Sequence, residues 1–228
     1  MDTLALWPLV KTFTQRTGAT MPVPDPETAV PKLAVSVLML RRDAPELEIF
    51  IQHRATTMDF AAGAVVFPGG RVDDADYVAG AAAAPEETVL ERHADAWHQT
   101  AVAANGDETL QELSVVLLAA AIREVREETG AALTASELLP WANWVTPPGG
   151  PKRFDTYFYL AIIGPSVNPR HQTTEADASH WWPVRKVLDE AAAGNLQLLR
   201  PTYTLLKDLA GFDDLQDIVN SGRPIIPR

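Results

Sequence analysis

The 228-residue sequence contains no cysteine, which excludes disulfide bridges and metal sites built from thiolates. It also lacks an apolar run long enough to span a bilayer, and its first residues lack the basic stretch of a secretory signal. The last three residues, 226–228, do not form a peroxisomal targeting tripeptide. These absences predict a cytoplasmic protein without a membrane partner.

Positive charge is scarce, since 19 Lys and Arg residues face 30 Asp and Glu residues, giving a net charge of −11. This balance argues against general nucleic-acid binding. It would also repel a phosphate-bearing substrate, so binding one requires a divalent metal and a local basic cluster. Hydrophobic residues make up 46% of the chain, which is enough to fill the core of one domain.

Residues 123–130, Arg-Glu-Val-Arg-Glu-Glu-Thr-Gly, are the most informative stretch. On an α-helix Glu124, Glu127 and Glu128 fall at positions i, i+3 and i+4, so that their carboxylates share one face. Their repulsion costs about 0.2–0.5 kcal/mol per pair, and both Arg123 and a bound cation would offset it. Oxygen-only ligands favour a hard ion such as Mg²⁺ or Mn²⁺. The alternative is a solvated, glutamate-rich helix end.

Upstream, a short apolar run ends in Pro68-Gly69-Gly70. The two segments together resemble the box of the Nudix hydrolase superfamily. That box reads Gly, five residues, Glu, seven residues, then Arg-Glu-apolar-x-Glu-Glu-x-Gly-apolar. Gly70 matches the first glycine, and the second half is matched by Arg123, Glu124, Val125, Glu127, Glu128, Gly130 and Ala131.

The sequence departs from this box between its halves. Asp76 stands where the first glutamate belongs, and about 39 residues are inserted before Arg123. Counting back from Arg123 gives Val115 in place of the glutamate, so either Asp76 or Glu112 is a candidate to replace it. The insert, about residues 77–113, contains a predicted helix over 86–103. It either caps the substrate cleft or forms the surface of a homodimer.

A box split in this way resembles the box of one branch of the superfamily, the peroxisomal-type acyl-coenzyme A diphosphatases and their bacterial relatives. The likeness covers roughly residues 33–210, and it is carried further by segments 49–70, 144–147, 153–156, 182–183 and 200–202. It implies an α/β fold, a Nudix-like α/β/α sandwich with a mixed β-sheet and a helical insertion within the box. The Nudix domain would span 32–212, between an N-terminal arm with a Pro-rich linker (1–31) and a C-terminal tail (213–228).

Sequence patterns give the elements independently of this likeness. They predict strands at 33–40, 46–53, 141–145 and 156–163, the first two as a hairpin, helices at 108–129 and 184–193, and a last helix after residue 202.

The resemblance also implies the chemistry of a metal-dependent hydrolase that cleaves the pyrophosphate of a nucleoside diphosphate derivative. Glu124, Glu127, Glu128 and the Gly70 carbonyl would hold Mg²⁺ or Mn²⁺, with Glu124 as bridging ligand or base. Arg123 would orient the glutamates through charge-assisted hydrogen bonds. Glu175, in a polar loop predicted over 164–180, is either a group that helps to activate water or a surface glutamate.

The substrate is a small nucleotide whose phosphates need cations, and four basic residues are candidates to bind it: Arg54, Arg71, Lys152 and Arg153. The branch points to coenzyme A or acyl-CoA, split into 3′,5′-ADP and (acyl-)phosphopantetheine. A pyrophosphatase acting on ADP-ribose or NADH is the alternative enzyme. A non-catalytic nucleotide sensor with the same fold is the alternative from another class.

Overall fold

The computed structural model describes residues 30–43, 46–58, 61–100, 110–149 and 152–228. The strands are β1 (Lys32–Asp43), β2 (Glu46–Arg54), β3 (Val65–Val66), β4 (Gly69–Arg71), β5 (Leu139–Val145), β6 (Phe154–Ile162) and β7 (Ala176–Pro183). The helices are α1 (Asp74–Ala82), α2 (Glu87–Trp97), α3 (Leu110–Thr129), the 3-10 turn η2 (Ala135–Glu137), α4 (Val184–Ala192), α5 (Arg200–Leu209) and α6 (Leu215–Asn220).

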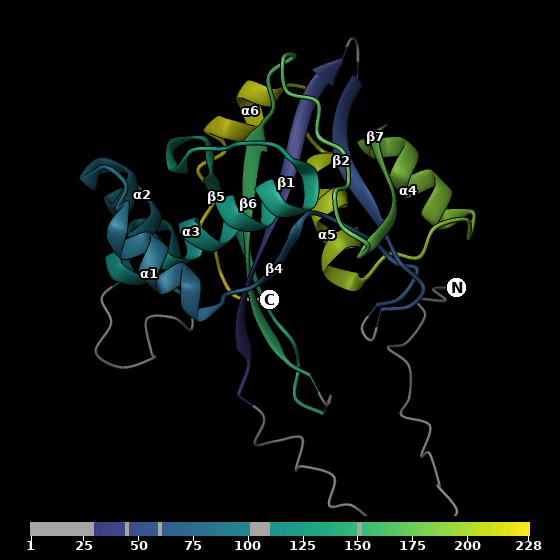
Figure 1. Ribbon diagram of the computed structural model, residues 1–228. Helices are drawn as coiled ribbons and strands as arrows, with labels where there is room; N and C mark the ends of the chain where they lie inside the picture. Colours follow the sequence, from purple (N-terminus) through teal and green to yellow (C-terminus); the bar gives the residue numbers. More distant parts are fainter. Residues whose placement is uncertain (1–29, 44–45, 59–60, 101–109, 150–151) are drawn as a thin grey trace, which may run out of the picture.

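One mixed β-sheet lies at the centre of the molecule, with helices on both of its faces (Figure 1). Its main path runs β3-β2-β1-β6-β5, with β4 paired to β1 and β7 paired to β2. The β1–β6 pair is parallel, and the other pairs are antiparallel. The predicted α/β/α sandwich with a mixed sheet is therefore confirmed.

The strands β1 and β2 diverge. The space between them holds the turn that contains Gly69 and Gly70, which we call the glycine turn. The two strands pair only near their shared turn, from Leu40 opposite Ile49 to the end of the hairpin. Farther along, β1 pairs with β4, where Val35 lies opposite Gly70, while β2 pairs with β3. Residues 65–71 therefore fill the wedge between the two diverging strands.

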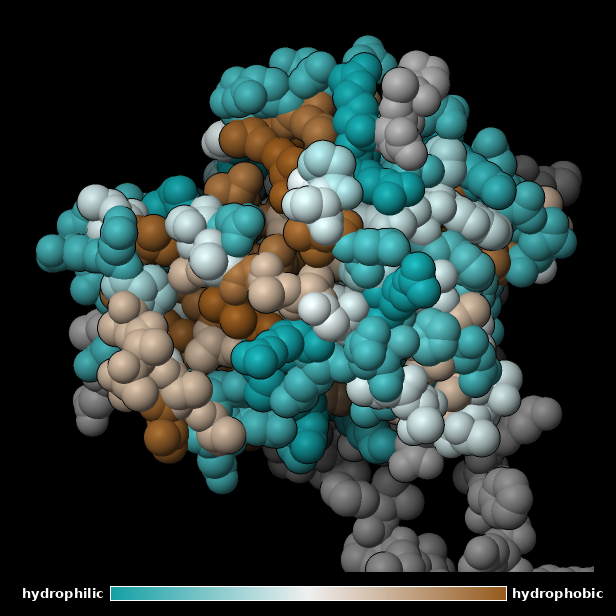
Figure 2. Space-filling view, turned by 45° about the horizontal axis from the view of Figure 1, so that its top comes forward, coloured by the Kyte–Doolittle hydropathy of each residue, from teal (hydrophilic) through white to brown (hydrophobic). Residues whose placement is uncertain are grey.

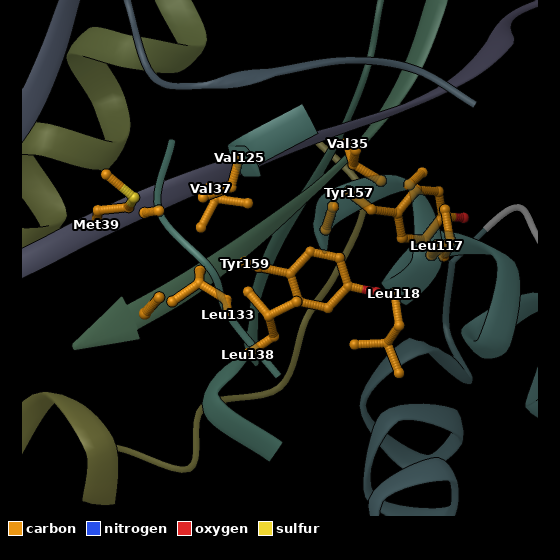
Figure 3. Packing of buried hydrophobic residues seen from close by; sticks show 14 of the residues in the cluster. Val35, Val37, Met39, Leu117, Leu118, Val125, Leu133, Leu138, Tyr157 and Tyr159 are labelled. Carbon is orange, nitrogen blue, oxygen red and sulfur yellow. The ribbon is translucent and has the colours of Figure 1, made fainter. Parts of the chain in front are cut away.

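Two apolar layers hold the helices on the sheet. Along β1, Val35, Val37 and Met39 belong to the layer under α3, and Leu38 and Leu40 to the layer under α4, α5 and α6. Figure 3 shows the first layer, in which the buried ring of Tyr159 lies among aliphatic side chains of α3 and of the segment before β5. The predicted apolar stripe of α3 enters this layer through Leu113, Leu117, Ala120, Ala121 and Val125.

The sequence prediction missed α1, which lies in the alanine-rich part of the insert. This helix packs tightly on α3, because a Cβ atom at Gly80 would lie 2.6 Å from Val115 Cγ1. The second insert helix, α2, is shorter than predicted. It is fixed by the buried His93, whose ring contacts the carbonyl oxygens of Val89 and Leu138.

The prediction of a loop over 164–180 is wrong from Ala176 onward, because residues 176–183 form the edge strand β7, which pairs with β2. Ala and Asp have low strand propensity, so pairing with β2 rather than local preference makes this segment a strand.

The residues assigned by sequence to a C-terminal tail pack on the sandwich. Ile218 of α6 enters the apolar layer under α4 and α5, and Val145 N–H of β5 donates to Arg228 O at 2.9 Å. The N-terminal arm, residues 1–29, lies outside the described residues, as do residues 101–109 of the insert. None of the described helices is long and apolar enough to cross a membrane.

Candidate active site

The glutamates of α3 lie against the glycine turn that fills the wedge in the sheet. Gly69 N–H donates to Glu128 Oε2 at 3.0 Å. Gly70 adjoins Glu124 so closely that a Cβ atom on Gly70 would lie 2.3 Å from Glu124 Oε1. A side chain at Gly70 would thus displace the Glu124 carboxylate. The sequence singled out Gly70 but missed the Gly69 amide, for which the paired glycines were the only signal.

Arg123 joins the two halves of the split box. Its Nε and Nη2 donate to Asp76 Oδ1 and Oδ2, both at 2.8 Å, across 47 residues of sequence. Its Nη1 donates to Glu124 Oε1 at 2.9 Å and to Glu127 Oε2 at 3.1 Å, and its Nη2 also donates to Arg71 O at 3.1 Å. These bonds, above all those to Asp76, raise the pKa of Arg123. The guanidinium therefore positions two of the three glutamates.

Of the two candidates to replace the missing glutamate, Asp76 is the one that contacts Arg123. Its side chain is 1% exposed and accepts the two bonds from Arg123 and a third, at 2.8 Å, from Asp73 N–H. The other candidate, Glu112, lies in the first turn of α3, about 16 Å along the helix from Arg123 at 1.5 Å per residue. Because its bonds are directed to Arg123 and the start of α1, Asp76 acts as a positioning group.

Asp76→Ala is expected to destabilise the protein by about 3 kcal/mol, because it breaks a largely buried ion pair and leaves Arg123 without its main partner. It should also weaken divalent-metal affinity about 10–100-fold, the range for losing an outer-shell contact. Thermal unfolding and a metal titration measure the two effects. Asp95→Ala, at an exposed position of α2, is the control. Equal behaviour of the two variants would contradict the positioning role.

The glutamates differ in burial and in proton affinity. Burial raises the pKa of Glu128 to about 8; the Gly69 N–H opposes the rise, and the charges of Glu124 and Glu175 add to it. Burial also raises the pKa of Glu124, against the lowering effect of Arg123. Glu127, by contrast, has a side chain that is 57% exposed. The protein thus holds two carboxyl groups that resist ionisation in the absence of a bound cation.

The raised pKa of Glu128 predicts a pH-dependent stability of the metal-free protein. The unfolded-state pKa is about 4.3 and the folded value about 8, so the folded state binds the extra proton. The stabilisation is present at low pH and is lost as the pH rises from about 5 through 8. In EDTA, Glu128→Gln should flatten this decline and raise the melting temperature at pH 8. Identical slopes for the two proteins would contradict the assignment.

Two further predicted site residues lie at the glutamate cluster. Glu175 precedes β7, and its charge raises the pKa of both Glu124 and Glu128. Ala55 N–H donates to Glu175 O at 2.8 Å, which fixes this residue beside the end of β2. The last residue of β2, Arg54, lowers the pKa of Glu128, and its buried Nε has no hydrogen-bond partner among the described residues.

The other basic candidates lie farther away. The Arg71 side chain is exposed, 3.8 Å from Asp73 Oδ1. Arg153 Nε donates to Thr146 O at 3.0 Å in the β5–β6 hairpin. Arg153 directly precedes β6 and lies four residues, or about 13 Å, before Tyr157, which pairs with Val35 opposite Gly70. Lys152 is one residue farther and exposed. The structure thus does not bring Lys152 and Arg153 to the glutamates.

The carboxylate and carbonyl oxygens of this site are the type of ligand that a hard divalent cation prefers. Glu124 and Glu128 lie on one side of the glycine turn, and Gly70 leaves open the space that a Cβ atom would fill beside Glu124. Within the described part of the chain, however, no three Asp, Glu or His side chains converge on one point. Arg123 holds Glu124 Oε1 and Glu127 Oε2. Binding a cation here therefore means exchanging arginine–glutamate hydrogen bonds for metal–oxygen bonds.

The fold and this site can be compared with known proteins. Residues 111–201 match the model of the NUDIX domain. The match begins late in the insert, so Gly70 and Asp76 lie outside it.

A curated Caenorhabditis elegans protein named "Putative nudix hydrolase 7" is 27% identical over 190 residues, 79% of this chain. The aligned part spans only 62% of that relative's length. The crystal structure of a NUDIX hydrolase from Alicyclobacillus acidocaldarius is 25% identical with a TM-score of 0.65, covering 88% of this chain and all of that one. The NUDIX domain of Shewanella oneidensis NrtR, solved with ADP ribose, has a TM-score of 0.51 at 15% identity, over 80% of this chain and 88% of that one, a likeness of fold.

Proposed function

We propose that the chain is a metal-dependent hydrolase that cleaves the pyrophosphate linkage of a nucleoside diphosphate derivative. One observation carries the proposal: α3 presses Glu124 and Glu128 against Gly69 and Gly70, while Arg123 bonds both Glu124 and Asp76. Carboxylates buried beside one another destabilise the metal-free protein. Such a cost is expected where the groups serve a ligand rather than the fold.

Glu124, Glu127, Glu128 and the Gly70 carbonyl are the residues proposed to hold Mg²⁺ or Mn²⁺. The cation would polarise a phosphoryl oxygen and make a bound water more acidic. Glu124, with its raised pKa, is the proposed acceptor of the proton from the attacking water. Glu175 is the second candidate, because its charge acts on both Glu124 and Glu128. Arg54, with an unpartnered Nε beside Glu128, is the cation best placed to bind a substrate phosphate.

For the substrate we favour coenzyme A or acyl-CoA, cleaved to 3′,5′-ADP and (acyl-)phosphopantetheine. The split box supports this choice, together with the likeness of residues 49–70 to the acyl-CoA diphosphatase branch. ADP-ribose and NADH are the competing substrates, since they carry the same linkage.

A substrate panel separates these enzymes. CoA, acetyl-CoA, a long-chain acyl-CoA, ADP-ribose, NADH and a diadenosine polyphosphate are each incubated with Mg²⁺, Mn²⁺ or EDTA, and the products are identified by mass. Metal-dependent release of 3′,5′-ADP from CoA species, well ahead of the others, is the expected result. Preference for ADP-ribose or NADH would keep the chemistry and overturn the choice of CoA.

A nucleotide-binding protein without turnover is the second candidate. It is favoured by the altered first glutamate of the box, since Asp76 stands at that position and is bonded to Arg123. Retained nucleotide binding with no metal-dependent product from any member of the panel would establish it over the hydrolase.

A further inference from the structure

A groove of about 660 Å³ lies beside the glutamate cluster. It is lined by Lys32, Leu33, residues 71–75 and Tyr77. Arg71 connects it to the cluster, because Arg71 O accepts a hydrogen bond from Arg123 Nη2 at 3.1 Å. The volume falls within the range of about 300–1,000 Å³ that is typical of sites for small molecules.

The lining of the groove has the chemistry of a nucleoside site. Tyr77, a residue that is 39% exposed, contributes an aromatic side chain to the lining, and Leu33 and Val72 add partly buried apolar surface. Lys32 and Arg71 balance the charges of the two aspartates in the lining, so the groove is neutral in a chain of net charge −11. A base can stack on the ring, carboxylates can accept bonds from ribose hydroxyls, and the cations suit an adjoining phosphate.

The insert helix α1 holds this ring in a fixed position relative to the glutamates. Asp76, the residue before Tyr77, is bonded through both carboxylate oxygens to Arg123. At the other end of α1, Gly80 packs so closely on α3 that a Cβ atom would lie 2.6 Å from Val115 Cγ1. Figure 2 shows hydrophobic side chains gathered over the lobe that α1 and α2 form. The ring therefore moves with the catalytic helix rather than with a free loop.

We propose that this groove binds the nucleoside half of the substrate, with the base stacked on Tyr77 and Lys32 and Arg71 beside the adjoining phosphate. The insert in the box thereby completes the substrate cleft. This assignment rests on the proposed function, because it places one half of that substrate. It leaves the scissile linkage between the groove and the glutamates, on the side of Arg71 and Arg123.

The test is a calorimetric titration of AMP and, separately, of inorganic pyrophosphate into the full chain. Tyr77→Ala should weaken AMP binding about tenfold or more, as for loss of one base–aromatic stack, and leave pyrophosphate binding unchanged. Tyr77→Phe should retain AMP affinity. Val78→Ala, the next residue and 72% exposed, is the matched control. With the preferred substrate of the panel, Tyr77→Ala should raise KM and leave kcat within about twofold.

Absence of AMP binding to the wild-type chain would overturn the assignment. So would equal AMP affinity of the wild type and Tyr77→Ala, or parallel losses of AMP and pyrophosphate binding. Because binding is measured without turnover, it separates the two proposals. AMP binding that depends on Tyr77 in a chain that hydrolyses nothing would keep the nucleoside site and overturn the hydrolase.

Discussion

Glu124→Gln is expected to lower kcat by about 10²–10⁴-fold, the range for loss of a positioned acid or base. The amide keeps the size of the side chain and can still accept the bond from Arg123 Nη1, which is 2.9 Å in the wild type. It loses the charge that would bind a cation and accept a proton. Because Glu124 is largely buried against Gly70, removing its charge should not unfold the protein.

The measurement is kcat at saturating substrate and metal, with thermal unfolding recorded alongside. Glu91→Gln, at an exposed position of α2, removes the same charge away from the site and should leave kcat unchanged. A loss of less than tenfold in Glu124→Gln would contradict its role as base or bridging ligand. An equal loss in both variants would point to net charge rather than to position.

Alanine at Gly69 and alanine at Gly70 are expected to have opposite effects, although the residues are adjacent. Gly69 has a φ of +153°, and a Cβ atom there would lie 2.2 Å from Val35 O and 2.6 Å from Ser36 Cα. These are backbone atoms of the central strand β1 and cannot move aside. Gly69→Ala should therefore destabilise the protein by about 3 kcal/mol or more, as for strain at a position that only glycine tolerates.

At Gly70 the added Cβ atom would meet the end of the Glu124 side chain, which can rotate away. Gly70→Ala should thus cost about 1 kcal/mol or less in stability yet lower kcat about 100-fold, because a displacement of about 1 Å at the reacting groups has that effect. Thermal unfolding measures the stability of the two variants, and steady-state kinetics measure their kcat. A folded, active Gly69→Ala or an unfolded Gly70→Ala would contradict this description of the turn.

The helix α3 could be predicted from sequence because its signal is local. The apolar stripe of α3 and the spacing of its glutamates lie within one continuous helix, and the prediction of 108–129 compares with the observed Leu110–Thr129. The hairpin of β1 and β2 was likewise evident from two apolar runs separated by a short turn. Such patterns depend only on the period of the backbone.

Features that depend on pairing across the chain could not be predicted. The bond between Asp76 and Arg123 spans 47 residues and an insert, so the sequence left Asp76 and Glu112 as equal candidates. The first residues of β7, from Ala176 to Ser179, have little intrinsic strand preference and form a strand by pairing with β2. Lys152 and Arg153 follow a Gly- and Pro-rich loop, but the register of β6 places them away from the glutamates.

The most direct test of the account is Mn²⁺ binding, followed by electron paramagnetic resonance, in the wild type and in a variant with Glu124, Glu127 and Glu128 all changed to Gln. The wild-type chain is expected to bind Mn²⁺ and to hydrolyse its substrate in proportion to the bound ion. The triple variant, folded by its thermal transition, should lose both properties. Equal Mn²⁺ binding by the two proteins, or hydrolysis that persists in the triple variant, would contradict it.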